Sequence, residues 1–134
     1  MKKSSKFYIL LITILSFAAA IHAQDKPKKF TRPTLAMNDL AVNDLVTAVR
    51  NQPGDDSKMI VIKNGIKNNT DGITVDQEIK LLNHFSNDKA KLDCAIFLYP
   101  WCVDYKNYTK LQYNMSTPDG AKAILDFIKK QPVK

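Results

Sequence analysis

Glycine and histidine are both scarce in this sequence. The four glycines are isolated from one another, so the chain has no glycine-rich loop to cradle a phosphate group. No serine stands in the glycine-rich turn that presents the nucleophile of many hydrolases. Of the two histidines, His22 falls in an N-terminal apolar segment, which leaves His84 as the one candidate base elsewhere. A Ser-His-Asp or Cys-His enzyme would therefore depend on His84 alone.

Alternation of apolar and polar residues with period two, the mark of a half-buried strand, is also absent. Apolar residues recur instead at helical spacing, as Val42, Leu45, Val46 and Val49 do. The sequence therefore predicts an all-α protein, and the fourth helix is apolar nearly all round, which predicts a place at the centre of the core. We expect six short helices, near residues 37–50, 59–68, 74–85, 87–99, 107–115 and 117–130.

One long hydrophobic run is present, and it lies at the N-terminus. Residues 1–23 combine a charged start, an apolar stretch and a small-residue end, which is the pattern of a secretory signal peptide. We expect cleavage after Ala23, with Ala20 as the second choice, and an uncleaved membrane anchor is the alternative. Cleavage predicts export to the periplasm or the extracellular space and leaves no integral membrane span.

A basic footprint for nucleic acid is absent from the part of the chain that is expected to fold. The formal net charge of +7 includes three signal lysines, and residues 24–33 hold four basic residues against one acid. From Thr34 onward 13 basic residues face 12 acidic ones. We therefore expect a basic linker at residues 24–36, a nearly neutral helical domain at residues 37–131, and no nucleic-acid partner.

Cysteine is limited to Cys94 and Cys102. Export would place both in oxidising conditions, in which they could form a disulfide. If both lay on one helix, about 12 Å would separate them, which is beyond the reach of a disulfide. Pro100 is expected to break the helix between them, so a Cys94–Cys102 disulfide and two buried free thiols both remain open.

Several polar residues mark helix starts and turns. Thr74 followed by Gln77 is a capping-box pattern at the start of the third helix. Asn107 is expected to cap the fifth helix. Asp71 and Asp104 precede these two starts, and a shift of 33 residues superposes them. The match predicts two helix-turn-helix repeats with a flanking helix at each end.

The segment KNNTDGITVDQE resembles a calcium-binding loop. Asn69, Asp71 and Glu78 stand where ligands belong when Gly72 is taken as the sixth position. The first position is Lys67, however, and its ammonium group repels a cation where an anion is required. Weak calcium binding by these three residues is therefore the alternative to a purely structural turn around Asp71.

The segment LYPWCVDYKNY carries a dense group of aromatic residues. Trp101 and Tyr105 are the best candidates for a binding surface, because Trp and Tyr are enriched in binding hot spots. Asp104 is expected to hold the turn through backbone donors at the start of the helix headed by Asn107. Asp104 with His84 is the pairing that a small hydrolase would use, and no nucleophile is paired to it.

The segment ITVDQEIKLLNHFSNDKAKLDCAIFLYPWCVDYKNYTKL, followed by a last helix that ends LDFIKK, resembles the family known as domain of unknown function 4476. The resemblance spans residues 37–130 and implies a small exported helical domain of Bacteroidetes-type bacteria, with no known catalytic residues. The matched positions are cap and core residues: Thr74, Gln77, Leu82, Phe85, Lys91, Leu92, Ala95, Tyr99, Pro100, Asp104, Asn107 and Tyr108.

The function expected from these features is binding without catalysis. We expect an exported helical domain that recognises a protein or another component of the cell envelope and that needs no cofactor. It is expected to be a monomer or a weak dimer. A weak calcium-binding helix-loop-helix protein is the alternative.

Overall fold

The computed structural model describes residues 30–132, and its compact unit begins at Arg32. Within these residues the chain forms α-helices and 3-10 helices and no strand, so the prediction of an all-α fold is confirmed. The elements are α2 (Asp39–Arg50), α3 (Asp55–Lys67), α4 (Val75–Leu82), α5 (Asp88–Leu98), η2 (Tyr99–Trp101), η3 (Tyr105–Asn114) and α6 (Pro118–Lys129). The six predicted helices correspond in order to α2, α3, α4, α5, η3 and α6.

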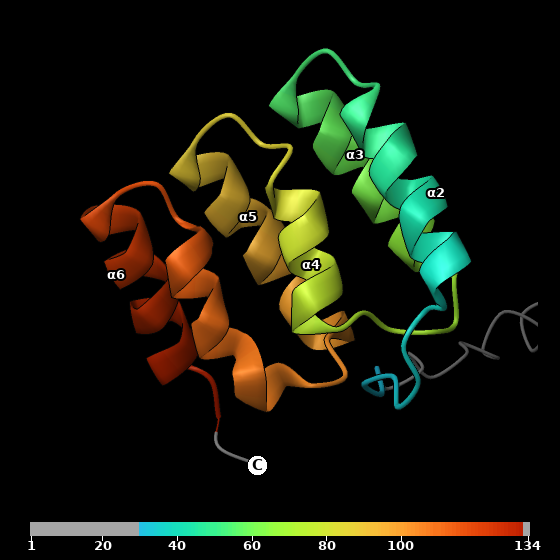
Figure 1. Ribbon diagram of the computed structural model, residues 1–134. Coiled ribbons are helices and arrows are strands. Elements are labelled where there is room, and N and C mark those ends of the chain that lie inside the picture. The colour runs from blue at the N-terminus through green and yellow to red at the C-terminus, as the bar shows by residue number, and fades with distance from the viewer. Residues whose placement is uncertain (1–29, 133–134) are drawn as a thin grey trace, which may run out of the picture. The chain divides into compact units, whose positions relative to one another are not determined.

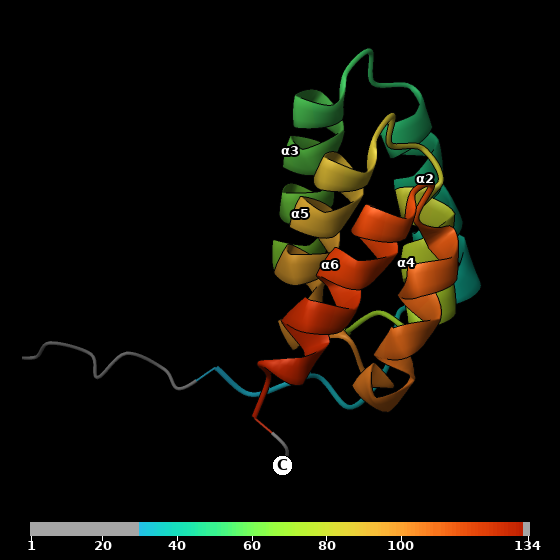
Figure 2. The same ribbon diagram turned by 90° about the vertical axis from the view of Figure 1, so that its left-hand side faces the viewer.

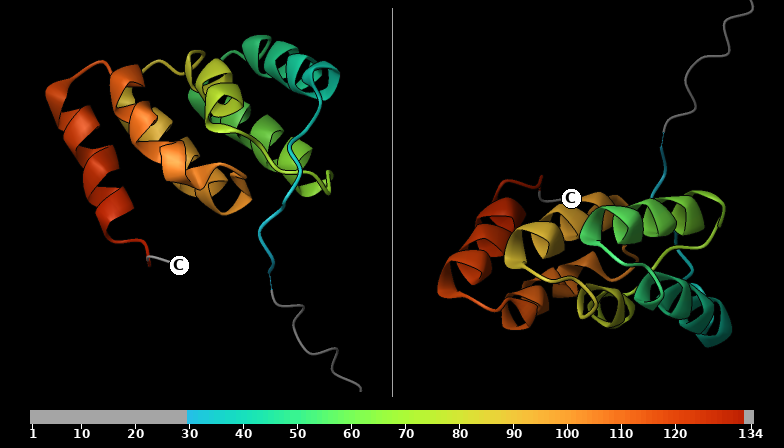
Figure 3. Two further views of the ribbon diagram at one scale, coloured as in Figure 1. Left: turned by 60° about the horizontal axis from the view of Figure 1, so that its bottom comes forward. Right: turned by 90° about the horizontal axis from the view of Figure 1, so that it is seen from above.

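Consecutive helices alternate between two layers. The helices α3, α5 and α6 lie side by side in one layer, and α2, α4 and η3 form the other (Figures 2 and 3). The loops α2–α3, α4–α5 and η3–α6 lie at the end of the molecule that is uppermost in Figure 1. The grouping of these helices into two helix-turn-helix repeats stays a prediction.

Side-chain caps explain where most of the helices begin. Asn38, Thr74, Asn87 and Thr117 are N-cap residues, and the side chain of each accepts a hydrogen bond from a backbone N–H in the first turn. The predicted capping box is present, because Gln77 N–H donates to Thr74 Oγ1 at 3.2 Å and Thr74 N–H donates to Gln77 Oε1 at 3.0 Å.

The start of the fifth helix differs from its prediction. The helix η3 begins at Tyr105, so Asn107 lies inside it rather than at its cap, and the predicted role of Asn107 is wrong. Its side-chain N–H donates to Asp104 Oδ2 at 3.2 Å instead. The buried residues Tyr108 and Leu111 stand three positions apart, which suits the three-residue turn of a 3-10 helix.

The core lies between the two layers and is mostly aliphatic. One predicted feature of it is wrong, because Ile96 on α5 is 41% exposed and this helix belongs to a layer rather than to the centre. The buried hydrophobic residues are Met37, Val42, Leu45, Val49, Ile62, Ile66, Ile73, Val75, Leu81, Leu82, Phe85, Cys94, Ala95, Leu98, Cys102, Tyr108, Leu111 and Ile124.

Two aspartates tie successive loops together at the end that is uppermost in Figure 1. Asp55, the first residue of α3, accepts hydrogen bonds from Ser86 N–H and from the Ser86 hydroxyl. Asp88, the first residue of α5, accepts from the backbone N–H groups of Ser116 and Thr117 at 2.7 and 2.8 Å. Asp55 therefore joins the start of α3 to the loop that precedes α5, and Asp88 joins the start of α5 to the loop that precedes α6.

Membrane-spanning helices can be assessed only in the described part of the chain, which begins at residue 30. Among residues 30–132, no helix has both the length and the apolar character that crossing a bilayer demands. The predicted signal peptide and residues 24–29 of the predicted basic linker lie outside the described residues.

Candidate functional site

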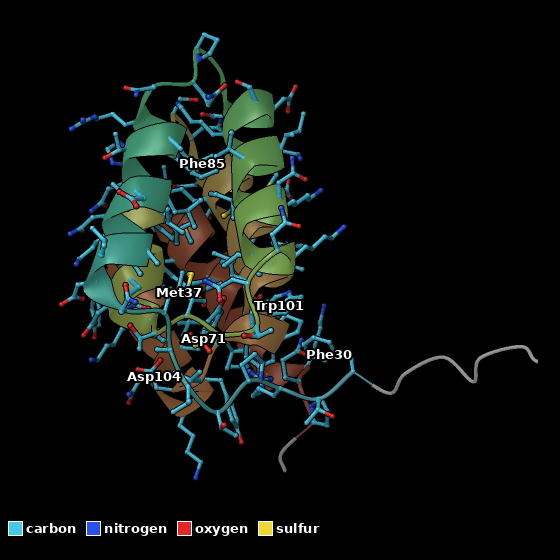
Figure 4. The ribbon with its side chains drawn as sticks, turned by 90° about the vertical axis from the view of Figure 1, so that its right-hand side faces the viewer. Phe30, Met37, Asp71, Phe85, Trp101 and Asp104 are labelled. Atoms are coloured by element: carbon cyan, nitrogen blue, oxygen red, sulfur yellow. The ribbon has the colours of Figure 1, made fainter. Side chains whose placement is uncertain are left out.

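Three backbone segments run side by side at the end of the molecule opposite the loops uppermost in Figure 1, and we call this region the bridged end. It comprises residues 32–37, 71–78 and 99–108. Gly72 N–H donates to Leu35 O at 2.7 Å, and Ile73 N–H donates to Trp101 O at 3.0 Å. These bonds form parallel bridges between Ala36 and Gly72 and between Ile73 and Cys102. Figure 4 shows Met37, Asp71, Trp101 and Asp104 gathered in this region.

Gly72 is required at the bridged end by the close approach of these backbones. A Cβ atom at this position would clash with the carbonyl oxygen of Trp101 and would lie 2.8 Å from Val103 Cγ1. The glycine that suggested the sixth position of a calcium loop therefore has a packing role. Beside it, Asp71 N–H donates to Asn69 Oδ1 at 3.1 Å, which closes the turn that was predicted around Asp71.

Asp104 is structural, as predicted, but it serves a different helix from the one expected. Its Oδ1 accepts a 2.8 Å hydrogen bond from the N–H of Val75, the first residue of α4. That N–H has no partner within its own helix, so the carboxylate completes the capping that Thr74 and Gln77 begin. Burial acts to raise the pKa of Asp104, but the hydrogen bonds from Val75 and Asn107 outweigh it and hold the pKa below its ordinary value.

Glu78 is the feature of the bridged end that sequence reasoning missed. Its side chain is fully buried, and its Oε2 lies 2.7 Å from the hydroxyl oxygen of Tyr108. Its other oxygen, Oε1, has no hydrogen-bond partner among residues 30–132. Burial raises the pKa of Glu78 to about 8, although its hydrogen bond with Tyr108 acts in the opposite direction. The group is therefore mostly neutral at pH 7.

The helical period contained a signal for this burial. Glu78 stands three residues after Val75 and four before Leu82, and all three are fully buried on one face of α4. The calcium-loop pattern assigned Glu78 to a ligand position and so drew attention away from that face.

Both cysteines are free thiols, and both are buried. Burial raises the pKa of the Cys94 thiol, and Glu78 acts in the same direction at pH values at which it is ionised. The pKa of Cys102 is raised for the same two reasons, and its thiol donates to Asp104 Oδ1 at 3.4 Å. Thiols of this kind are poor nucleophiles, because the reactive thiolate is suppressed.

Arg32 holds the N-terminal segment against the bridged end. Its guanidinium group donates to the carbonyl oxygen of Cys102 at 2.8 Å and to that of Tyr99. The same group lies over the rings of Tyr99 and Tyr105, with 4.9 and 4.2 Å between its central carbon and the ring centroids. The prediction that assigned residues 32–36 to the linker is therefore corrected, since Arg32 is part of the compact unit.

The predicted binding residues Trp101 and Tyr105 are both half-buried at the bridged end. Tyr105 packs edge-to-face against Tyr99, with 6.2 Å between the ring centroids, and Arg32 covers it. Trp101 ends η2, and its carbonyl oxygen forms the bridge to Ile73. The structure thus places both residues at the bridged end and brings Tyr105 into contact with Arg32, which the sequence had suggested only as part of a basic tail.

Comparison with known proteins agrees with this helical domain. The family model described as a domain of unknown function, DUF4476, matches residues 36–128. The chain belongs to the DUF4476 family. None of the curated proteins or solved structures with which the chain was compared matches it.

In this DUF4476 domain, nothing in the arrangement of Asn69, Asp71 and Glu78 favours a calcium site. Asn69 Oδ1 already accepts a hydrogen bond from Asp71 N–H, and Glu78 is buried against Tyr108. Calcium binds to ionised carboxylates, whereas Glu78 is mostly neutral at pH 7. Residues 30–132 contain no group of three or more His, Cys, Asp or Glu side chains placed to hold a metal ion.

The hydrolase pairing of His84 with Asp104 is separated by the length of a helix. His84 follows the C-terminal end of α4, whereas Asp104 is bonded to Val75 at the start of that helix. The nine intervening steps correspond to about 13 Å at the helical rise. A direct hydrogen bond between the two side chains is therefore out of reach.

Proposed function

We propose that this DUF4476 chain is an exported, non-catalytic domain that binds a protein or another component of the cell envelope. The binding surface that we propose consists of Trp101, Tyr105 and Arg32 at the bridged end. Export would follow from a signal peptide at residues 1–23, which lie outside the described residues. The observation that carries the proposal is the contact of the half-buried Tyr105 with Arg32, at the same end of the molecule as the half-buried Trp101.

These three residue types are common binding anchors. Trp, Tyr and Arg are enriched in hot spots because they offer a large contact area and polar groups together. Edge-to-face packing against Tyr99 and the guanidinium group above it restrict the motion of the Tyr105 ring. A restricted side chain loses less conformational entropy on binding, which favours affinity.

The polar residues support a role without catalysis. Asp104 is committed to Val75 N–H, and Glu78 is buried and mostly neutral. The two thiols are buried, and their pKa values are raised. Asp104, Glu78 and the two thiols are thus either occupied by a contact within the fold or removed from solvent.

A site-specific crosslinking experiment tests the surface. A photoreactive phenylalanine analogue would replace Tyr105 in one variant and Tyr113 in a matched control, because Tyr113 is also aromatic and is 84% exposed on η3. Both variants would be expressed with the full N-terminus and irradiated in intact cells. We expect a discrete adduct from position 105 and none from position 113. Adducts from position 113 alone would place the contact elsewhere.

Affinity for the crosslinked component then separates binding from folding. We expect Trp101→Ala to weaken binding at least tenfold at a temperature at which the variant is fully folded; its melting temperature is also expected to fall, because Trp101 packs partly against the core. Export is tested separately by the N-terminal sequence of the mature protein, which we expect to begin at Gln24. An intact N-terminus in the cell would contradict export with cleavage.

A further inference from the structure

The hydrogen-bond geometry around Tyr108 limits the protonation state of Glu78. The Tyr108 hydroxyl oxygen lies 2.7 Å from Glu78 Oε2 and 2.6 Å from the carbonyl oxygen of Ala95. A phenol has one proton and can donate to only one of these two oxygens. A backbone carbonyl has no proton to give. Both short contacts are therefore hydrogen bonds only when Glu78 carries a proton and donates it to the phenol oxygen.

The surroundings of Glu78 give an ionised carboxylate little compensation, because burial outweighs the interactions with Tyr108 and Cys102 that act to lower its pKa. The thiols of Cys94, from α5, and Cys102, from the segment before η3, are its other titratable neighbours, and Asp104 adds a negative charge. The charge of Arg32 acts to lower the pKa of Glu78, but its guanidinium group is already bonded to the carbonyl oxygens of Tyr99 and Cys102. Among the described residues, no ion pair includes Glu78.

We propose that Glu78 is a proton-dependent latch, which is closed when it is protonated and which releases the contact between α4 and η3 when it loses its proton. Loss of the proton leaves a charge next to the unpartnered Oε1 and removes one of the two hydrogen bonds of the Tyr108 hydroxyl. The low polarity of the core makes that charge costly. Water reaches it when the segment that contains Cys102 and Tyr108 separates from α4.

The direction of the pH effect follows from the position of Glu78. Its pKa is raised to about 8 in the fold, from an ordinary value of 4.5. The folded state binds this proton more tightly than the unfolded state does. The contribution of the proton to the free energy of unfolding is therefore fully present below pH 4.5 and is lost as the pH rises through 8. Between these values the opening constant increases up to tenfold for each pH unit. Because the released segment contains Trp101 and Tyr105, the latch would also control the proposed binding surface, a consequence that rests on the proposed function.

The latch itself is tested without any binding partner. Urea unfolding of the wild type, Glu78→Gln and Asp76→Asn would be measured between pH 5.5 and 7.5, where ordinary aspartates are ionised. Gln imitates the protonated acid, whereas Asp76 is an exposed acid on the same helix, 74% exposed and 3.7 Å from Lys110. We expect the unfolding constant of the wild type and of Asp76→Asn to rise about a hundredfold relative to that of Glu78→Gln.

Native-state hydrogen exchange of the wild type provides a second test that needs no substitution. Between pH 6 and 8 we expect the amides of Val103 and Asn107 to lose protection, after correction for intrinsic exchange, and to be less protected at each pH than those of Val49 and Ile62 on α2 and α3, which exchange through global unfolding. Equal pH dependence of the wild type and Glu78→Gln would overturn the latch. If Glu78→Gln does not fold, the exchange profile decides, and either a pH-independent protection of Val103 and Asn107 or a protection there equal to that of Val49 and Ile62 would overturn it.

Discussion

Replacement of Asp104 gives the sharpest test of how the bridged end is held together. Asp104→Ala removes the acceptor of Val75 N–H, a 2.8 Å hydrogen bond that is part-buried, and the exposed contact with Asn107. A net hydrogen bond contributes about 1 kcal/mol, and an unpaired donor adds to the loss when it is shielded from water. We expect Asp104→Ala to lower the free energy of unfolding by about 1 to 2 kcal/mol.

Asp104→Asn separates the acceptor from the charge. The amide oxygen can still accept from Val75 N–H, so the remaining cost is the loss of a negative charge near the start of α4 and of the contact with Asn107. Such a charge contributes about 0.3 to 1 kcal/mol. We therefore expect Asp104→Asn to be clearly less destabilised than Asp104→Ala in urea melts at pH 7.

The pH dependence of these melts follows from the lowered pKa of Asp104. The contribution of its charge is present above the ordinary aspartate pKa of 3.8 and is lost as the pH falls through the lower value in the fold. The advantage of the wild type over Asp104→Asn should therefore shrink in acid.

Asp71→Ala is the matched control for Asp104→Ala. The 33-residue shift pairs the two aspartates, but within the described residues no hydrogen bond to the Asp71 carboxylate is found, and its N–H bonds to Asn69. We expect Asp71→Ala to cost less than about 0.5 kcal/mol. Melts of Asp104→Ala that superimpose on those of the wild type would refute the reasoning about Val75. A stabilisation by millimolar calcium that Asp71→Ala abolishes would restore the calcium loop.

Three further substitutions test separate contacts of the same region. Thr74→Ala should cost about 1 kcal/mol in urea melts through loss of the capping box, and an unchanged melt would show that the start of α4 is misplaced. Gly72→Ala should cost at least about 1 to 3 kcal/mol because the new methyl group meets Trp101 O, so a mutant as stable as the wild type would contradict the close backbone approach. Arg32→Lys should lower the melting temperature although the charge is kept, because an ammonium group lacks the planar fork that bonds two carbonyl oxygens. Equal melting temperatures would show that these two hydrogen bonds do not stabilise the fold.

The helices were largely predictable because their signals are local. A cap such as Thr74 bonds to residues within the next turn, and the apolar period reports which face is buried. The exceptions have a common origin in contacts between distant residues. Asp104 was predicted to bond to the start of the fifth helix. Its actual partner, Val75, is 29 positions away in the sequence, and no local pattern reveals such a contact.

The candidate site was predictable only in part for the same reason. Trp101 and Tyr105 were chosen from composition, and both lie at the bridged end. Arg32 was counted with the basic tail, because its contacts to Tyr99 and Cys102 span 67 and 70 positions. Glu78 was considered only as a possible calcium ligand, although its helical face indicated burial. Charged residues are rarely fully buried, so the prior favoured the wrong choice.

The central claim about the site is that the fold keeps Glu78 as a neutral acid, and the carboxyl carbon of that residue reports on it directly. Glu78 is the only glutamate in the sequence, so glutamate labelled with carbon-13 at the carboxyl position gives one resonance to assign. We would follow its chemical shift from pH 4 to pH 9 in the wild-type domain. The account predicts a titration midpoint near the pKa of about 8, with little change around pH 4.5. A midpoint at or below 4.5 would contradict it, because the carboxylate would then be ionised throughout the range in which the latch should be closed.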